Sequence, residues 1–171
     1  MQQYLIATEE VSKLSRDMSI HLDNSKIETY IRESENIDIK SALGDALFLD
    51  VKEHPEKYDI LLNGGEYDSE CGIKRYLIGL KTALAYYTYA RIVKNGDGNV
   101  SRFGFVNKES EYSSRPDIKE KVMTYNDTFS VADKYLKECV RYLNDCKNDF
   151  PLYNGRGNLK ANRTVFRIIG E

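Results

Sequence analysis

Residues that commonly serve in catalysis or metal binding are few and scattered in this sequence. The two histidines, His21 and His54, have no nearby cysteine or second histidine that would complete a metal site. The three cysteines, Cys71, Cys139 and Cys146, form no CxxC pair, and we interpret them as buried or half-buried thiols. No GxSxG, GxxxxGK or GxGxxG segment is present. The sequence therefore predicts no catalytic residue, no cofactor and no metal.

Closely spaced carboxylates occur in the segment 64–72, where Glu66, Asp68 and Glu70 alternate with other residues. Such a set is a candidate ligand group for a divalent cation, because hard cations prefer carboxylate oxygens. A solvated acidic loop is the simpler interpretation, and it is the one we favour.

Charge is distributed unevenly along the chain. Residues 1–72 carry 16 acidic and 7 basic side chains, whereas residues 73–110 carry 7 basic and 2 acidic ones. Two oppositely charged faces on one protomer would favour head-to-tail contact between copies. A solvated surface of mixed charge explains the same numbers. Residues 151–171 carry 4 basic side chains and 1 acidic one, a weak basic patch by the standards of nucleic-acid-binding proteins.

The segment from Gly72 to Asn95 organises the rest of the chain. Its apolar side chains recur at steps of three and four, which predicts a helix with a buried face. Further apolar residues lie off this stripe, so the exposed arc is narrow. A helix that is apolar most of the way round is surrounded by other elements, and we therefore predict a central helix.

The remaining segments predict a mainly α protein, a helical bundle of four to six helices with a long C-terminal helix and short β segments or extended arms. A single domain spans 1–171, with 1–8 and 156–171 as terminal arms. The longest predicted helix covers about 117–147, and shorter ones cover about 9–14, 25–35, 37–54 with Gly44 inside it, and 58–62. Residues 4–7 are predicted as a strand or a docked arm, residues 103–106 as a strand or a loop packed on the core, and residues 164–169 as a final strand. No apolar run approaches the roughly 20 residues of a membrane span, and the N-terminus is not typical of a signal peptide, which favours a cytoplasmic protein.

A series of short segments resembles a known family of viral proteins. The segments keep a common order and spacing over about residues 20–155. They are Tyr30-Ile31-Arg32-Glu33-Ser34-Glu35, Leu43-Gly44-Asp45-Ala46-Leu47, Leu61-Leu62-Asn63-Gly64-Gly65-Glu66-Tyr67, Leu84-Ala85-Tyr86-Tyr87, Tyr89-Ala90-Arg91, Phe103-Gly104-Phe105-Val106-Asn107-Lys108 and Tyr142-Leu143-Asn144. Through these segments the chain resembles the head–tail connector proteins, or ring proteins, of Bacteroidetes phages and prophages, including crAss-like phages.

The resemblance implies a structural role in the virion. Such adaptor proteins look like helical bundles that assemble into a ring, commonly of twelve copies, beneath the portal protein. The ring continues the channel for packaged DNA, without sequence-specific contact, and offers a docking surface to adjacent tail or ring proteins. The family has no catalytic residues to transfer, and it implies packing roles for Leu84, Tyr86 and Tyr87 and an ion-pair role for Arg91. The implied location is the head–tail interface of the virion, after assembly in the host bacterial cytoplasm, without a membrane partner.

Contact residues are expected on the flanking segments rather than on the central helix. We hypothesise that residues 156–171 pack on an adjacent subunit or on the portal. The predicted interface residues are Tyr112, Arg156, Arg163, Phe166 and Arg167. Two other functions stay open at this point: a small nucleic-acid-binding protein that uses the basic C-terminal tail, and a small enzyme of unknown type.

Overall fold

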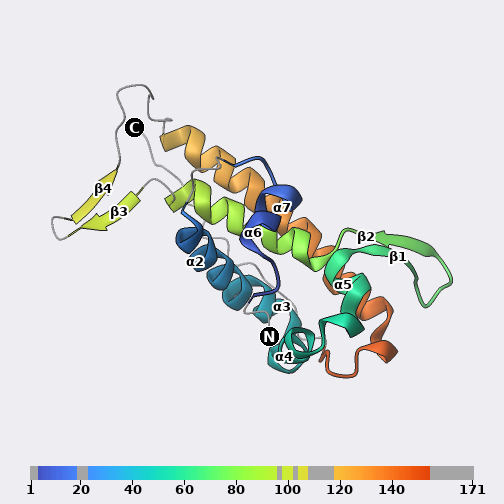
Figure 1. The fold of residues 1–171 in the computed structure, drawn as a ribbon. Helices are drawn as coiled ribbons and strands as arrows, with labels where there is room; N and C mark the ends of the chain where they lie inside the picture. The colour runs from blue at the N-terminus through green and yellow to red at the C-terminus, as the bar shows by residue number, and fades with distance from the viewer. Residues whose placement is uncertain (1–3, 19–22, 96–97, 102–103, 108–117, 155–171) are drawn as a thin grey trace.

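The computed structural model describes residues 4–18, 23–95, 98–101, 104–107 and 118–154, and it is mainly helical (Figure 1). A long helix near the C-terminus and two small hairpins confirm the predicted fold class. In chain order the elements are α1 (Thr8–Leu14), α2 (Asn24–Ser34), the π-helix η1 (Glu35–Ile39), α3 (Lys40–Leu43), α4 (Asp45–Glu53), the 3₁₀-helix η2 (Pro55–Tyr58), α5 (Asp59–Asn63), β1 (Gly65–Asp68), β2 (Lys74–Leu77), α6 (Leu80–Asn95), β3 (Gly98–Ser101), β4 (Gly104–Asn107), α7 (Ile118–Asp145) and the 3₁₀-helix η3 (Lys147–Asp149).

Helix α6 is the central helix of the fold. It packs along α7, and α1 and α2 cover it from other sides (Figure 1). Aromatic pairs join α6 to α7: Tyr86 meets Tyr135 edge to face with ring centroids 5.4 Å apart, and Tyr87 meets Phe129 at 5.0 Å. Half of its residues are buried, which confirms that this helix is surrounded. They are Leu80, Ala83, Leu84, Ala85, Tyr87, Thr88, Ala90 and Ile92.

The predicted start of the central helix at Gly72 is wrong. Residues Lys74–Leu77 form strand β2, which pairs antiparallel with β1, and the helix begins only at Leu80. The segment 64–72, interpreted as an acidic loop, instead contains strand β1 and the turn of this hairpin. The hairpin forms because β1 and β2 exchange backbone hydrogen bonds and cover part of the core with Tyr67 and Leu77.

Two glycines allow the two ends of this hairpin to approach each other closely. Gly64 precedes β1 with φ +85°, and Gly79 follows β2 with φ +97°, a region that favours glycine. A Cβ on Gly79 would lie 2.7 Å from the backbone of Asn63 and Gly64, and one on Gly64 would lie 2.5 Å from the carbonyl oxygen of Leu77. Glycine at both positions therefore allows the two ends of the hairpin to lie side by side without a backbone clash.

We predict that Gly79→Ala lowers the free energy of unfolding by about 3 kcal/mol, because the Cβ adds a backbone clash to an unfavourable φ. Gly44→Ala is the matched control, since Gly44 has φ +80° but open space around a Cβ. The control should lose only about 1–2 kcal/mol. Urea unfolding followed by circular dichroism measures both, and equal losses would show that the close approach does not matter.

A second correction concerns Gly44, which was predicted inside one continuous helix. It has φ +80°, ends α3 and precedes the first residue of α4, so the chain turns there. An L-residue rarely takes this conformation, and a helix does not continue through it. The helical stripe is therefore divided between two short helices, α3 and α4.

The N-terminal arm packs on the helices before α1 begins. Leu5 and Ile6 are buried, and the backbone N–H of Leu5 donates to the carboxylate of Glu35 in η1. The N–H of Ala7 donates to Glu10 Oε2 at 2.8 Å, which helps to cap α1. The interpretation of residues 4–7 as a docked arm is thus confirmed.

The long C-terminal helix agrees with its prediction over Ile118–Asp145. The segment predicted at 103–106 overlaps strand β4, which pairs with β3. The strand predicted at 164–169 and the arm 156–171 lie outside the described residues. None of the helices in the described part of the chain combines the length and apolar character that a membrane span requires.

Candidate assembly surfaces

The five residues predicted at an interface cannot be placed, because Tyr112, Arg156, Arg163, Phe166 and Arg167 all lie outside the described residues. They remain predictions. The described part of the chain nevertheless offers three other surfaces that suit protein contacts: the β1–β2 hairpin, the start of α7, and a cleft beside the N-terminal arm.

The β1–β2 hairpin has one buried and one exposed face. Tyr67 and Leu77 point inward, and Tyr67 meets Tyr142 of α7 edge to face with centroids 4.6 Å apart. On the outer face Tyr76, opposite Glu66, is 65% exposed, and Ile73 just before β2 is 56% exposed. Large apolar side chains that are this exposed on a two-stranded hairpin are suited to contact with another protein.

The hairpin is fixed to α7 through one carboxylate. Asp145 at the end of α7 accepts a hydrogen bond from Arg75 Nη1 at 2.9 Å and one from the Tyr67 hydroxyl at 3.2 Å. Burial, followed by the Asp145 charge, raises the pKa of Tyr67. The exposed face of the hairpin is therefore presented by an anchored element.

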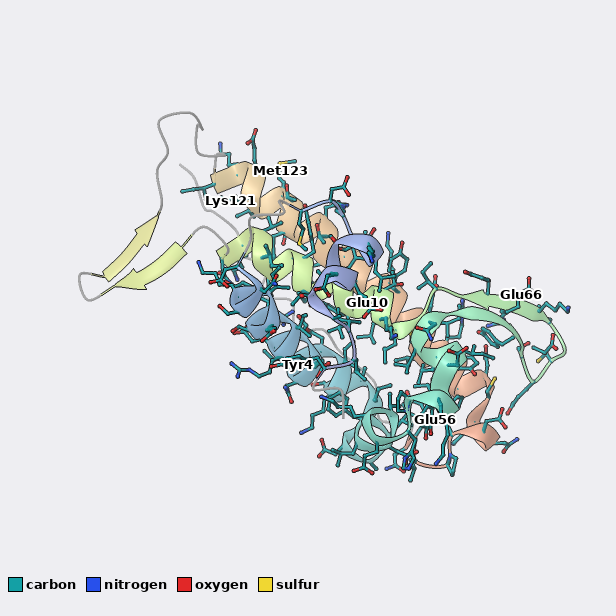
Figure 2. All side chains as sticks on the ribbon, in the orientation of Figure 1. Tyr4, Glu10, Glu56, Glu66, Lys121 and Met123 are labelled. Carbon is teal, nitrogen blue, oxygen red and sulfur yellow. The ribbon has the colours of Figure 1, made fainter. Side chains whose placement is uncertain are left out.

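The start of α7 lies at the opposite end of the molecule from the hairpin (Figure 2). Ile118 and Met123 are each 71% exposed, the highest exposure among the large hydrophobic residues described. Lys119 and Lys121 lie between them in the sequence. Glu120 lies between the two lysines, so this end combines apolar side chains with charges of both signs.

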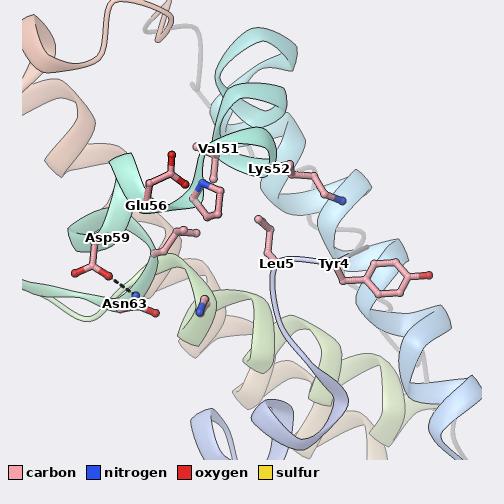
Figure 3. Close-up of a pocket in the computed structure, with 10 residues that line it drawn as sticks. Tyr4, Leu5, Val51, Lys52, Glu56, Asp59 and Asn63 are labelled. Atoms are coloured by element: carbon pink, nitrogen blue, oxygen red, sulfur yellow. Dashed lines mark hydrogen bonds between the residues drawn. The ribbon is translucent and has the colours of Figure 1, made fainter. Parts of the chain in front are cut away.

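A cleft of about 230 Å³ lies between the N-terminal arm, the end of α4, η2, α5 and the start of α6 (Figure 3). Its apolar lining includes Leu5, Val51, Pro55 and Leu62. Its polar lining comprises Tyr4, Lys52, Glu56, Asp59, Asn63 and Lys81.

An ionic cluster ties α6 to the region where α2 passes into η1. Arg91 Nη1 lies 2.7 Å from Asp38 Oδ2, and Arg91 Nε lies 3.8 Å from Glu33 Oε2. Arg91 also donates to the Ser34 hydroxyl at 3.1 Å. Burial raises the pKa of Asp38, and the Arg91 guanidinium offsets only part of this effect. The ion-pair role that the resemblance implied for Arg91 is confirmed.

Tyr87 extends this interior polar region toward α7. Its hydroxyl donates to Asp133 Oδ1 at 2.7 Å, and its pKa is raised mainly by burial and then by Asp133. A shifted pKa sometimes marks a catalytic group, but buried ion pairs produce the same shifts. Because the side chains of Asp38 and Arg91 are 10% and 12% exposed, we interpret the cluster as a structural connection between helices.

A second buried carboxylate, Glu35, fixes the N-terminal arm. It is 1% exposed, accepts from the N–H of Leu5 and pairs with Lys52 Nζ at 2.9 Å. The same ammonium lies over the rings of Phe48 and Tyr4, at 5.4 and 5.9 Å from their centroids. Glu35 therefore joins the arm, η1 and α4.

The three cysteines lie in different surroundings. Burial raises the pKa of Cys139 to about 12, which keeps it protonated, and Cys146 is half-buried. Cys71 is exposed, so the prediction that it is covered is wrong, because it lies in the turn of the hairpin. Among the described residues no three histidine, cysteine or carboxylate side chains gather as a metal site would require.

Sequence reasoning missed the exposed apolar residues that define two of these surfaces. Ile73 and Tyr76 were assigned to the buried stripe of the central helix. The polar turn from Ser69 to Gly72, between two segments with one apolar face each, was the available signal for a hairpin. For Met123 the sequence carried no such signal, because helical period alone does not tell which faces find a neighbour.

The described residues define a small helical protein with an apolar core, buried ion pairs between its helices and exposed apolar side chains at both ends. The chain belongs to the DUF6712 family, a family of unknown function, whose family model matches residues 39–163. The match includes both hairpins, α6 and α7, and it leaves out the N-terminal arm, α1 and α2. Comparison with curated proteins found no match. Comparison with solved structures found none either.

Proposed function

We propose that this protein is the subunit of a phage head–tail connector, an adaptor that forms a ring under the portal and extends the DNA channel toward the tail. The observation that carries the proposal is the exposure of large apolar side chains at opposite ends of the molecule. Ile73 and Tyr76 lie at the hairpin end, and Ile118 and Met123 lie at the start of α7 (Figure 2).

Two different surfaces at opposite ends favour head-to-tail contact. When one surface of a protomer binds a different surface of the next, the chain of contacts closes into a ring if the rotation allows it. Three of the seven basic side chains of residues 73–110, those of Arg75, Lys81 and Arg91, form ion pairs within the protomer, so the head-to-tail arrangement is argued from the exposed apolar surfaces. The ion pairs of Arg91 and Glu35 would keep the protomer rigid while its ends are engaged.

The sequence resemblance supplies the setting of this ring. The resemblance implies about twelve copies between the portal and adjacent tail or ring proteins, with DNA passing through the channel without sequence-specific contact. The location would be the head–tail interface of the virion, after assembly in the bacterial cytoplasm. The interior ionic groups, which we interpret as structural, agree with a protein whose role is assembly.

The C-terminal arm 156–171 is proposed to pack on a neighbouring subunit or on the portal, with Arg156, Arg163, Phe166 and Arg167 as contact residues. Tyr112 is likewise proposed to contact a neighbouring subunit or the portal. Four basic side chains in residues 151–171 suit a partner surface that is acidic, such as one formed by residues 1–72 of the next copy.

Deletion of residues 156–171 tests this assignment. The shortened chain should keep the circular dichroism spectrum of the full chain but lose co-sedimentation with the portal protein encoded by the same genome. Unchanged co-sedimentation would refute the arm's role. Salt-dependent binding of the full chain to DNA, lost on the same deletion, would instead favour the nucleic-acid-binding alternative.

A further inference from the structure

Strand β2 has an edge whose backbone groups have no backbone partner among the described residues. In the antiparallel hairpin the N–H of Ser69 donates to the carbonyl oxygen of Ile73 at 3.0 Å, and hydrogen-bonded pairs alternate with non-bonded pairs from there on. The backbone groups of Lys74 and Tyr76 therefore point away from β1, and no backbone group elsewhere in the described chain pairs with them. Figure 1 shows β2 on the outer side of the hairpin, away from α5.

The opposite edge of the hairpin, on β1, is in contact with the end of α7. The thiol of Cys146 donates to the carbonyl oxygen of Asp68, with sulfur and oxygen 3.9 Å apart. An additional strand is therefore expected at the edge of β2, where Tyr76 is 65% exposed and Ile73 is 56% exposed. An extended peptide that joins such an edge is held by main-chain hydrogen bonds, and its alternate side chains give specificity.

The charges of the hairpin favour a basic partner. Glu66, Asp68 and Glu70 are exposed, and none of them forms an ion pair with another described residue. Strand β2 adds two basic residues, of which Arg75 is already paired with a carboxylate of α7 at 2.9 Å. The hairpin therefore carries an excess of negative charge.

The C-terminal arm has the composition of such a partner. Residues 155–171 carry four basic side chains and one acidic one, and they contain the strand predicted at 164–169. This predicted strand is rich in β-branched and aromatic residues and includes Arg167. A segment of this kind can supply both the main-chain groups and the positive charge that the hairpin favours.

The arm follows a segment that is packed at the hairpin end of the molecule. Phe150 meets Tyr142 with ring centroids 5.3 Å apart, and Tyr142 in turn meets Tyr67 of β1. The N–H of Tyr153 donates to the carbonyl oxygen of Phe150 at 2.9 Å. Thr164 follows the last described residue by ten positions, which span up to about 33 Å when extended. This length is enough for the predicted strand to reach the hairpin of an adjacent copy.

We propose that residues 164–169 of a neighbouring copy add to the free edge of β2 as a third strand. The hairpin then becomes part of a three-stranded sheet, which is more stable than an isolated pair of strands. This inference rests on the proposed function of the arm and identifies the surface that receives it. The contact joins two different surfaces, so it repeats from copy to copy around a ring.

Cross-linking between two different variants tests the contact in the full-length chain. One variant carries Tyr76→Cys and the other carries Thr164→Cys, and both carry Cys71→Ser and Cys146→Ser, while the buried Cys139 stays in place. A short bismaleimide should join the mixed variants into a heterodimer. Because each variant has only one of the two introduced cysteines, this product forms only between copies.

The matched control uses Met123→Cys in place of Tyr76→Cys. Met123 is 71% exposed but lies at the opposite end of the molecule from the hairpin (Figure 2). The yield of heterodimer should therefore fall to the background seen without cross-linker. An equal yield from the control and the test variant would overturn the contact.

Charge reversal provides a second measurement. Glu66→Lys together with Asp68→Lys should weaken self-association about tenfold in sedimentation experiments, because the hairpin and the arm are then both basic. Adding Arg163→Glu and Arg167→Glu to the same chain should restore the association. Unchanged association after the first reversal would count against the contact.

The outcomes separate this contact from the connector function. Closed rings that give no heterodimer, whether alone or on the portal, would overturn the strand addition and leave the connector proposal standing. A heterodimer without any binding to the portal would support the strand addition and count against the connector function. A chain with both introduced cysteines that cross-links only within itself would place the arm on its own hairpin, which would overturn the contact between copies. A chain that stays monomeric at its highest soluble concentration, and gives no heterodimer on the portal, would overturn it as well.

Discussion

Replacement of Arg91 with alanine is expected to lower the free energy of unfolding by about 3–5 kcal/mol at neutral pH. The reason is that this substitution leaves the Asp38 carboxylate without its ion-pair partner. Asp38 is 10% exposed in its side chain and lies 2.7 Å from Arg91, so without the guanidinium it is a buried charge near Asp133. The loss should exceed that of any exposed arginine, such as Arg32 on α2, whose replacement should stay within about 0.5 kcal/mol.

The loss should depend on pH in a defined direction. Burial raises the pKa of Asp38 in the folded protein above its ordinary value of 3.8. Protonation of Asp38 therefore stabilises the folded state relative to the unfolded state. This stabilisation is complete below the pKa of Asp38 in the unfolded chain, and it is lost as pH rises through the pKa of Asp38 in the folded protein. Without Arg91 the folded pKa rises further, so the difference between Arg91→Ala and the natural chain should grow from acidic to neutral pH.

Urea unfolding across this pH range measures the effect. Adding Asp38→Asn to Arg91→Ala should recover part of the lost stability at neutral pH and remove most of its pH dependence, because the amide carries no charge. A loss for Arg91→Ala that is below 1 kcal/mol, or that is independent of pH, would show that the pair is not buried as described.

Replacement of Leu84 with alanine is expected to lower the free energy of unfolding by about 3–5 kcal/mol. Leu84 is fully buried in α6, the helix that α1, α2 and α7 surround. The loss combines the transfer of apolar surface with the cavity that rigid neighbouring helices cannot close.

Leu49 provides the matched control for Leu84. It is a helical leucine on α4 with 56% exposure, and Leu49→Ala should change stability by about 0.5 kcal/mol at most. Thermal and urea unfolding of both variants measure the difference. Similar losses for the two variants would contradict the central position of α6.

The central helix could be predicted because its signal is local and long. The burial of Leu80, Leu84 and Tyr87 follows from steps of three and four that persist over many residues. Strand β2 could not be separated from this pattern. In a segment of four residues, Tyr76 and Leu77 fit a helical stripe as well as an alternating strand, and the pairing with β1 decided the outcome.

The candidate assembly surfaces and the buried ion pairs were less predictable than the helices, because they depend on long-range packing. The pairing of Arg91 with Asp38 joins residues on α6 and η1 that are distant in the sequence. The cleft forms only where Leu5 of the arm meets α4 and α5. The positive φ of Gly44 likewise leaves no trace in a hydrophobic pattern. Periodicity tells which residues share a face, but whether another element covers that face is decided by the tertiary fold.

The connector proposal is tested most directly by electron microscopy of the full-length protein mixed with the portal protein encoded by the same genome. The prediction is an added ring layer on one end of the portal, whose subunits touch through different surfaces. Portal particles that remain unchanged at saturating concentrations of this protein would contradict the proposal.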